Sequence, residues 1–283
     1  MLRSDEGVVL RRTPFGDTSL VLHLFSREQG LLTVVARGVR AQNKRSALDR
    51  AALAGFHTLS FSHRSRSPLA MATLTQVEIG QPRHRLLHHP PALLAAQVMQ
   101  EILYRFLAPQ DPHPAIFNLL EQSWDGLEAG EAVLPWLAYC QSRLLQEIGY
   151  GWRCDSCAVC GRPHPLSHFS VKRNQTLCHL CVAPHLAPQH PPSSAVDRHG
   201  TPLAQRLFPL SAPLLSTLQQ LPHLNQPASL PDADHSVLYQ IGSACLSRLQ
   251  GKPLFADQAV LKYIENIHVT ATPAGEPCAN RQQ

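Results

Sequence analysis

The chain has few charged residues and no long apolar segment. Only 16% of its 283 residues are charged, whereas 44% are hydrophobic. This hydrophobic content can form buried cores, which excludes a globally disordered chain, and the length allows two or three domains. No apolar run approaches the ~20 residues that a membrane-spanning helix needs. The first residues, MLRSDEGVVLRR, contain no apolar stretch of the secretory kind. We therefore expect a cytoplasmic protein that does not contact a membrane.

Several catalytic motifs are also missing. The sequence has no G-x-x-x-x-G-K-[ST] phosphate loop and no H-E-x-x-H or G-x-S-x-G motif. It also lacks the H-x-E element that accompanies paired cysteines in zinc deaminases. Nothing in the sequence therefore supports an enzyme, and we do not expect one.

The net charge of +5 is concentrated at the beginning of the chain. Residues 1–80 contain 11 Lys/Arg and 6 Asp/Glu, whereas residues 81–283 contain 14 of each. A localised basic region is typical of proteins that bind polyanions.

Residues 1–80 are predicted to form a small β-barrel. Five short β-branched or Leu-rich runs occur here, beginning with GVVLRR and ending with PLAMATLTQVEIG, and turn sequences such as TPFGD separate them. A basic loop or short helix, VRAQNKRSALDRAALAG, lies between the third and fourth runs. Five runs in about 80 residues favour a closed barrel or sandwich.

The following residues are predicted to be helical. Apolar residues recur at helical spacing in three stripes, which end at Phe106, Leu127 and Ile148. Cys140 falls on the third stripe and is expected to be buried. A further stripe from Leu238 to Leu249 has Asp232 or Asp234 available as N-cap. We predict an α+β protein in which residues 81–150 and 184–267 form one helical domain, residues 151–183 are inserted as a cysteine module, and residues 268–283 form a flexible tail.

The cysteine module contains a predicted metal site. Cys157, Cys160, Cys178 and Cys181 give the spacing C-x2-C-x17-C-x2-C, which is typical of zinc-binding modules. Gly161 directly follows the first pair, where a metal knuckle turns sharply and glycine accepts a positive φ. The alternative pair, Cys154 and Cys157, is not followed by a glycine, so Cys154 is not predicted to be a ligand. Four thiolates fill a tetrahedral zinc shell, so the predicted zinc is structural.

Two other interpretations of the cysteines remain open. Cys154, Cys157 and Cys160 resemble the start of an iron–sulfur box, but His164 stands where its fourth cysteine would be. A redox C-x-x-C would need only one pair and would leave the second pair unexplained.

Basic residues of the barrel are the candidate DNA contacts. They cluster at the end of the first run, from the third run into the basic loop, and in the SHRSRS turn. The predicted residues are Arg11, Arg12, Arg37, Arg40, Lys44, Arg45, Arg64 and Arg66. Among the barrel phenylalanines, only Phe15 beside a turn glycine is expected to be free for base stacking. Lys172 and Arg173 are too few to predict DNA contact by the cysteine module.

The order of these parts resembles the bacterial DNA repair protein RecO family. The matching segments are GVVLRRTPFGDTSLVLHLFSREQG, ARGVR with KRSAL, and CAVCG with LCHLC. The turn of the first segment has Gly16-Asp17, where the family usually carries Gly-Glu.

The resemblance implies a recombination mediator with an N-terminal OB-fold. Such proteins bind single- and double-stranded DNA, anneal complementary strands without ATP, and therefore associate with the nucleoid. They contact RecR and the acidic C-terminal tail of single-strand-binding protein, and help load the recombinase RecA onto coated DNA. An RNA-binding or transcription-associated factor that combines a zinc ribbon with an OB-fold is the alternative.

Overall fold

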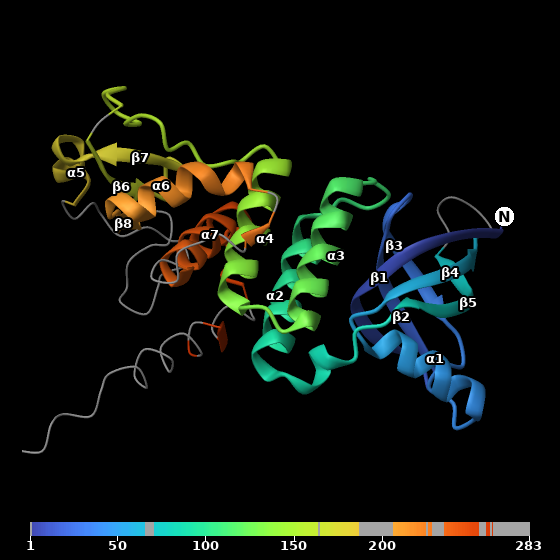
Figure 1. Ribbon diagram of the computed structural model, residues 1–283. Helices are drawn as coiled ribbons and strands as arrows, with labels where there is room; N and C mark the ends of the chain where they lie inside the picture. Colours follow the sequence, from blue (N-terminus) through green and yellow to red (C-terminus); the bar gives the residue numbers. More distant parts are fainter. Residues whose placement is uncertain are drawn as a thin grey trace, which may run out of the picture.

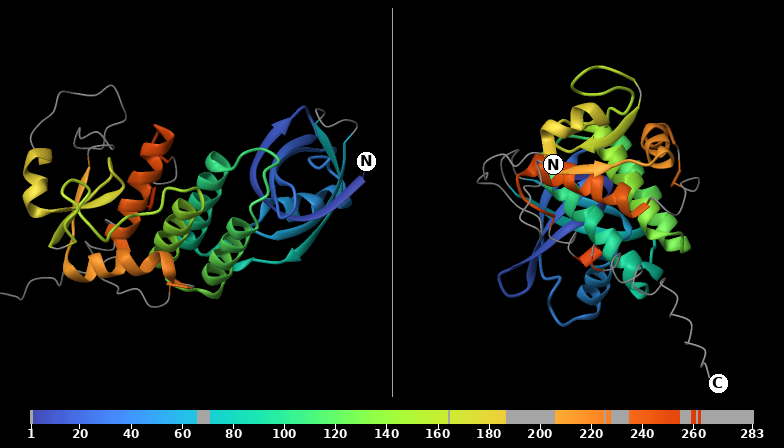
Figure 2. Two further views of the ribbon diagram at one scale, coloured as in Figure 1. Left: turned by 90° about the horizontal axis from the view of Figure 1, so that it is seen from above. Right: turned by 90° about the vertical axis from the view of Figure 1, so that its left-hand side faces the viewer.

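The computed structural model is elongated and has three parts in a row. It describes residues 2–65, 71–163, 165–186, 206–224, 226–227, 235–254, 259–260 and 262. A β-barrel forms one end, a layer of helices occupies the middle, and the cysteine module forms the other end (Figures 1 and 2). Two predicted features, the N-cap of the last helix and the C-terminal tail, lie outside the described residues.

The barrel has the strand order of an OB-fold. It contains β1 (Leu2–Phe15), β2 (Ser19–Ser26), β3 (Gly30–Ala36), β4 (Thr58–Arg64) and β5 (Ala72–Gln81). The sheet closes in the order β1-β2-β3-β5-β4, with only the β3–β5 pair parallel. Helix α1 (Lys44–Ala54) connects β3 to β4. The prediction of an α+β protein with an N-terminal OB-fold is confirmed.

Strand β1 is longer than the sequence predicted because it pairs with two neighbours in succession. Leu2 to Gly7 pair with β4, and Gly7 to Phe15 pair with β2, with a bulge between Val9 and Arg11. One long strand that changes partner at Gly7 closes a small barrel without an exposed edge, and the bulge bends it further. Alternate apolar residues from the strands fill the barrel, and Leu53 of α1 covers one opening.

The middle layer consists of helices, most of which the apolar stripes predicted. The predicted ones are α2 (Pro90–Phe106), α3 (Pro114–Ala129), α4 (Val133–Glu147) and α7 (His235–Gln250). Helix α6 (Ala212–Gln220) and the short 3-10 turns η1 (Arg85–His88) and η3 (Leu221–His223) were not predicted. Cys140 is buried in this layer, as predicted. Among the described helices, none is long and apolar enough to cross a membrane.

The barrel and the helices share one apolar core. Phe25 of β2 packs against Phe117 of α3 with the rings tilted by 56° and their centroids 5.4 Å apart, and both side chains are fully buried. At the β2–β3 turn the backbone N–H of Gln110 donates to the Leu31 carbonyl at 3.1 Å. Gly30 at this turn has φ +71°, and a Cβ there would lie 2.3 Å from the backbone oxygen of Asp111. The barrel is therefore seated directly on the helical layer.

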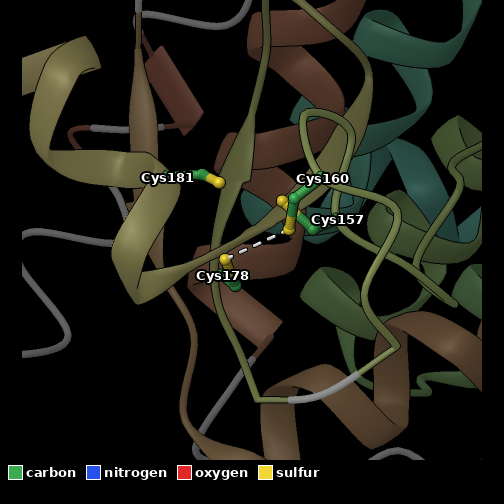
Figure 3. A group of neighbouring side chains, drawn as sticks. All are labelled: Cys157, Cys160, Cys178 and Cys181. Atoms are coloured by element: carbon green, nitrogen blue, oxygen red, sulfur yellow. Dashed lines mark hydrogen bonds between the residues drawn. The ribbon is translucent and has the colours of Figure 1, made fainter.

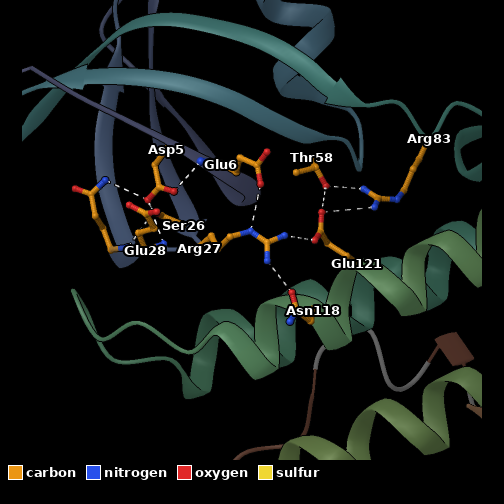
Figure 4. A network of polar contacts seen from close by, with 10 residues as sticks. Asp5, Glu6, Ser26, Arg27, Glu28, Thr58, Arg83, Asn118 and Glu121 are labelled. Carbon is orange, nitrogen blue, oxygen red and sulfur yellow. Dashed lines mark hydrogen bonds and ion pairs between the residues drawn. The ribbon is translucent and has the colours of Figure 1, made fainter. Parts of the chain in front are cut away.

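A polar network crosses the same boundary (Figure 4). The guanidinium of Arg27, in the turn after β2, donates to Glu6, to Asn118 and to Glu121 of α3, the last at 2.5 Å. Arg83, which follows β5, is fully buried, and its Nε donates to Asp125 Oδ1 at 2.7 Å. These arginines of the barrel region serve the domain boundary, and we do not count them as DNA contacts.

Candidate metal centre and nucleic-acid interface

The cysteine module is a small sheet followed by a short helix. Strands β6 (Leu166–Ser170) and β7 (Gln175–Cys178) form a hairpin, and α5 (His179–Leu186) follows directly. Strand β8 (Leu207–Pro209) adds to the free edge of β6, which the sequence did not predict. Phe169, Val171 and Phe208 join the core of the helical layer, so the module is anchored by apolar contacts as well as by its cysteines.

The structure brings four cysteines together (Figure 3). Cys157 and Cys160 lie in the loop before β6, Cys178 ends β7, and Cys181 lies in the first turn of α5. All four Sγ atoms lie within 4.8 Å of one another, and the Cys160 and Cys178 Sγ atoms are 3.7 Å apart. The cluster could hold a metal ion, and four sulfur donors on two knuckles suit a tetrahedral one.

The four cysteine thiols would not all be ionised near neutral pH without a bound cation. Although burial raises the pKa of Cys157, hydrogen bonds from the backbone N–H groups of Cys160, Cys178 and Val159 bring it down to about 6. The hydrogen bond with Cys178, together with burial and the nearby Cys157 and Cys160, raises the pKa of Cys181 to about 12. A bound dication supplies the positive charge that lets all four become thiolates.

Gly161 and Cys154 distinguish this set of four ligands from the alternative interpretations of the cysteines. Gly161 has φ +70°, and its N–H donates to the Cys157 carbonyl at 2.9 Å, which closes the turn after the first pair. Cys154 is instead buried in the helical core, and burial raises its pKa to about 12. A thiol held protonated in an apolar core is a poor metal ligand. His164, where an iron–sulfur box would place its fourth cysteine, lies outside the described residues.

The basic loop packs against the first hairpin of the barrel. The Arg40 N–H donates to the Thr18 carbonyl at 2.8 Å, and Arg40 Nη1 donates to the Gly16 carbonyl at 3.1 Å. Arg37 and Lys44 flank Arg40 on the loop and at the start of α1, and all three side chains are exposed. Among the described residues, no carboxylate forms an ion pair with any of them. We call these three residues and Phe15 the barrel tip.

Phe15 is the exposed aromatic residue at this place. Its side chain is 54% exposed, beside Gly16, whereas Phe25, Phe56 and Phe61 are at most 5% exposed. The sequence-based expectation that only Phe15 is free for stacking agrees with this burial pattern. Cations beside an exposed aromatic ring are the combination found where proteins bind single strands.

The other predicted contacts lie elsewhere on the barrel. Arg11 is turned toward the helical layer, where its guanidinium carbon lies 5.2 Å from the ring centroid of Tyr104. Arg12 borders the adjoining groove of about 390 Å³ between the barrel and α2. Arg64 is the exposed last residue of β4. The side chain of Arg45 and the whole of Arg66 lie outside the described residues.

A groove runs beside the barrel tip between the basic loop and β5. It has a volume of about 550 Å³ and is bordered by Arg37 and Ser46, but also by Asp49 and Glu78. The two carboxylates would repel phosphate inside the groove. A nucleic-acid backbone is therefore favoured on the outer side of the loop, where the cations are exposed.

Comparisons with known proteins agree on one family. Residues 1–83 match the family model "Recombination protein O N terminal" and residues 87–254 match "Recombination protein O C terminal". A DNA repair protein RecO of Bacillus pumilus is 29% identical over 201 residues, which cover 70% of this chain and 76% of that protein. DNA repair proteins RecO of Cupriavidus pinatubonensis and Haemophilus influenzae are 35% and 36% identical, each over 56% of this chain. The matched segments span only 53% and 64% of these two proteins. The chain belongs to the RecO family of DNA repair proteins.

Proposed function

We propose that the chain is a DNA-binding mediator of recombinational repair, and that the barrel tip is its main DNA-binding surface. The observation that carries this proposal is the joining of Arg37, Arg40 and Lys44 to the exposed Phe15 by the contact between the basic loop and the first hairpin. Free cations neutralise phosphates, and an exposed ring stacks on bases. The family assignment favours DNA over the RNA-binding or transcription factor considered as the alternative.

The position of Lys44 supports an anionic ligand. Lys44 is the first residue of α1, and Asn43 caps this helix by accepting from the Ser46 N–H at 2.8 Å. A cation at a helix N-terminus opposes the helix dipole, which costs about 0.3–1 kcal/mol. A phosphate bound at this place interacts favourably with both the dipole and the lysine. Lys44 therefore does not stabilise the free helix, and its position favours an anionic partner.

Contacts to phosphate do not distinguish sequences, so binding is expected to be sequence-tolerant and salt-sensitive. Single and double strands both offer such a backbone. Neutralising the phosphates of two complementary strands lowers their mutual repulsion and favours annealing without ATP. The remaining predicted contacts, Arg11, Arg12 and Arg64, would extend the path of the DNA over the barrel.

The protein partners follow from the family rather than from a described pocket. We propose that the chain acts with RecR, contacts the acidic tail of single-strand-binding protein, and helps load RecA onto coated DNA. These roles require no chemical step by the chain, and they place it with nucleoid DNA in the cytoplasm.

The four-cysteine cluster is proposed to bind structural zinc. All four positions of a tetrahedral shell would be filled by Cys157, Cys160, Cys178 and Cys181, which leaves no site for a substrate. The ion would join the loop that carries Cys157 and Cys160 to the end of β7 and the start of α5. Its binding free energy would then stabilise the fold of the module directly.

Strand annealing tests the proposed function. Complementary labelled oligonucleotides are mixed with wild-type protein, without ATP, over a salt series. The variant Arg37→Ala/Arg40→Ala/Lys44→Ala/Arg45→Ala is expected to bind DNA much more weakly and to lose most annealing. Each lost phosphate contact should reduce the slope of log K against log salt by about 0.7 for single strands.

The control is Lys252→Gln/Lys262→Gln, which removes two exposed cations far along the chain. It should anneal like wild type. Wild-type protein that neither binds nor anneals DNA would refute the proposed function.

A further inference from the structure

Charge is distributed unevenly over the part of the chain that sums to zero. Residues 81–150, the first part of the helical domain, contain 4 Lys/Arg and 7 Asp/Glu. Residues 151–183, the cysteine module, contain 4 Lys/Arg and a single acidic residue, Asp155. The barrel and the module lie at opposite ends of the molecule, with the helices between them (Figures 1 and 2). Residues 184–267, the second part of the helical domain, contain 5 of each, so that domain has a net charge of −3 and lies between two basic ends.

The cations of the module gather at the turn of its hairpin. Lys172 and Arg173 lie in the turn between β6 and β7, and both side chains are exposed. Arg153, far earlier in the loop, is held against the same turn by its backbone. Its N–H donates to the Asn174 carbonyl at 3.3 Å, and its carbonyl accepts from the Thr176 N–H at 3.1 Å. Tertiary structure thus adds a third exposed cation to the two adjacent ones.

These cations have no acidic partners among the described residues. No described carboxylate lies within ion-pair distance of Arg153, Lys172 or Arg173. In the helical layer, by contrast, Arg105 pairs with Glu101 and Arg143 with Glu147. The charge at the hairpin turn is therefore not needed to balance acidic side chains of the module.

The metal cluster does not account for this charge either. Cys178 lies at the opposite end of β7, three residues from the first residue of the strand. An extended strand rises about 3.3 Å per residue, so the separation is about 10 Å, which is one Debye length at 0.1 M salt. Arg162 is the basic residue next to the cluster, where its carbonyl accepts from the Cys157 N–H at 2.8 Å. The cations at the hairpin turn are therefore too far away to contact the cluster, and salt weakens their interaction with it.

An exposed aromatic residue lies beside the turn. Tyr150 is 48% exposed, and its carbonyl accepts from the Asn174 side-chain amide at 2.5 Å. The same amide donates to the Gly151 carbonyl at 3.1 Å. Asn174 has φ 53°, so the turn has a defined left-handed residue that these two bonds hold in place. The module therefore repeats the combination of the barrel tip, with free cations beside an exposed ring.

We propose that Arg153, Lys172, Arg173 and Tyr150, the hairpin patch, form a second binding surface for a nucleic-acid backbone. The inference rests on the proposed function in taking DNA as the ligand. Both ends of the molecule carry the same sign of charge and an exposed ring, so one class of polyanion suits both.

Two surfaces separated by the acidic helical layer can hold two DNA segments at once. Two segments held on one molecule have a raised effective concentration relative to each other. The repulsive middle also keeps a single strand from lying along the helices between the ends.

A coupling assay tests the hairpin patch in the full-length, zinc-loaded protein. A biotinylated oligo-dT of 30 nucleotides is captured on beads, and recovery of a second, fluorescent oligo-dT is measured. The two strands are not complementary, so annealing does not contribute. Wild type should recover the fluorescent strand, whereas Lys172→Gln/Arg173→Gln should recover several-fold less. The salt dependence of this second binding event should also be shallower in the variant, with the slope of log K against log salt lower by about 1.4, or about 0.7 for each lost contact.

The outcomes separate the two proposals. If Lys172→Gln/Arg173→Gln coupled strands as well as wild type and with the same salt slope, the hairpin patch would be overturned. In that case, loss of DNA binding in the barrel-tip variant would still support the proposed function. If wild type bound no DNA, both proposals would fall. If Lys172→Gln/Arg173→Gln kept DNA binding but lost binding of a poly-glutamate peptide, the ligand of the hairpin patch would be an acidic protein partner, and the proposal of DNA would be overturned.

Two controls accompany the assay. Lys252→Gln/Lys262→Gln should couple strands as wild type does, because it removes the same charge elsewhere. One equivalent of zinc and an unchanged melting curve in Lys172→Gln/Arg173→Gln would show that its module is folded. Arg173→Lys keeps the charge and should retain coupling.

Discussion

Replacing Arg83 with alanine is expected to destabilise the protein strongly, because this buried arginine joins the barrel to the helices (Figure 4). Its Nη1 donates to the Phe56 carbonyl at 3.2 Å and to Thr58 Oγ1 at 3.0 Å, both on the barrel side. Its Nε donates to Asp125 of α3 at 2.7 Å. The guanidinium carbon also lies 5.7 Å from the ring centroid of Trp124.

The magnitude follows from the burial of each partner. Asp125 is 51% exposed, so water can replace its bond to Arg83, and that pair contributes at most about 1 kcal/mol. The Phe56 carbonyl and the Thr58 hydroxyl are buried, and each lost charged hydrogen bond costs about 1.5–3 kcal/mol. Glu121, 4.0 Å from Arg83 Nη2, keeps its bond to Arg27. We expect Arg83→Ala to lower the free energy of unfolding by about 3–5 kcal/mol, the range for breaking a buried pair.

Urea denaturation followed by tryptophan fluorescence measures this change, since Trp124 lies beside the guanidinium. The melting temperature should fall by roughly 6–20 °C. Asp125→Asn should cost about 1 kcal/mol or less, and Arg85→Ala, on an exposed side chain, should also have a small effect. If Arg83→Ala cost no more than Asp125→Asn, the buried hydrogen bonds to the barrel would not hold the two parts together.

Three further predictions concern binding, metal and pH. Phe15→Ala should weaken single-strand binding by about 1–3 kcal/mol and double-strand binding much less, whereas Leu48→Ala, also exposed, should change neither in fluorescence anisotropy titrations. Cys178→Ala should lose zinc and melt the module, as measured by metal content and circular dichroism, whereas Cys154→Ala should keep one equivalent; loss of zinc in both would contradict the assigned ligands. Burial, with the charges of His84 and Arg83, lowers the pKa of His57 below 6.5 in the folded protein. As pH falls below 6.5 the unfolded state binds a proton at this histidine before the folded state does. The contribution of neutral His57 to stability is therefore present above pH 6.5 and is lost as pH falls toward the lower folded-state pKa. Urea denaturation between pH 7.5 and 5 should show this loss, with a slope of at most about 1.4 kcal/mol per pH unit from this residue, and His57→Asn should reduce it; an equal slope in the variant would refute the assignment.

The regular elements could be predicted because their signals are local. Apolar stripes at helical spacing gave α2, α3 and α4 within a few residues, and five β-rich runs gave the five strands of the barrel. Strand β8 was missed because three residues carry no periodic signal. It forms only because the free edge of β6 is available after a long intervening segment.

The cysteine cluster could be located because metal ligands follow strict spacing. The interval between the two pairs, together with Gly161, selected the same four residues whose sulfurs the structure brings together. The environment of Cys154 could not be deduced in this way. Its thiol faces the helical core near Cys245, and that burial depends on residues almost a hundred positions later in the chain.

The eight candidate DNA contacts show where sequence reasoning stops. Net charge located them in the barrel, but only the structure separates Arg37, Arg40 and Lys44 at the barrel tip from Arg11 on Tyr104. Arg27 and Arg83 carry the same charge and instead stabilise the domain boundary. A count of basic residues does not show where each side chain points, and the role of an arginine depends on the groups that its guanidinium contacts.

By itself the sequence determined the five-stranded barrel, the main helical stripes and the four clustered cysteines, because periodicity and spacing act between residues that are close along the chain. Only the tertiary structure decided which cations are free, which are buried in ion pairs, and that Arg153 joins Lys172 and Arg173 at the far end of the molecule. Those outcomes depend on distances between residues that are remote in sequence. The net charge of residues 81–283, which is zero, does not show them.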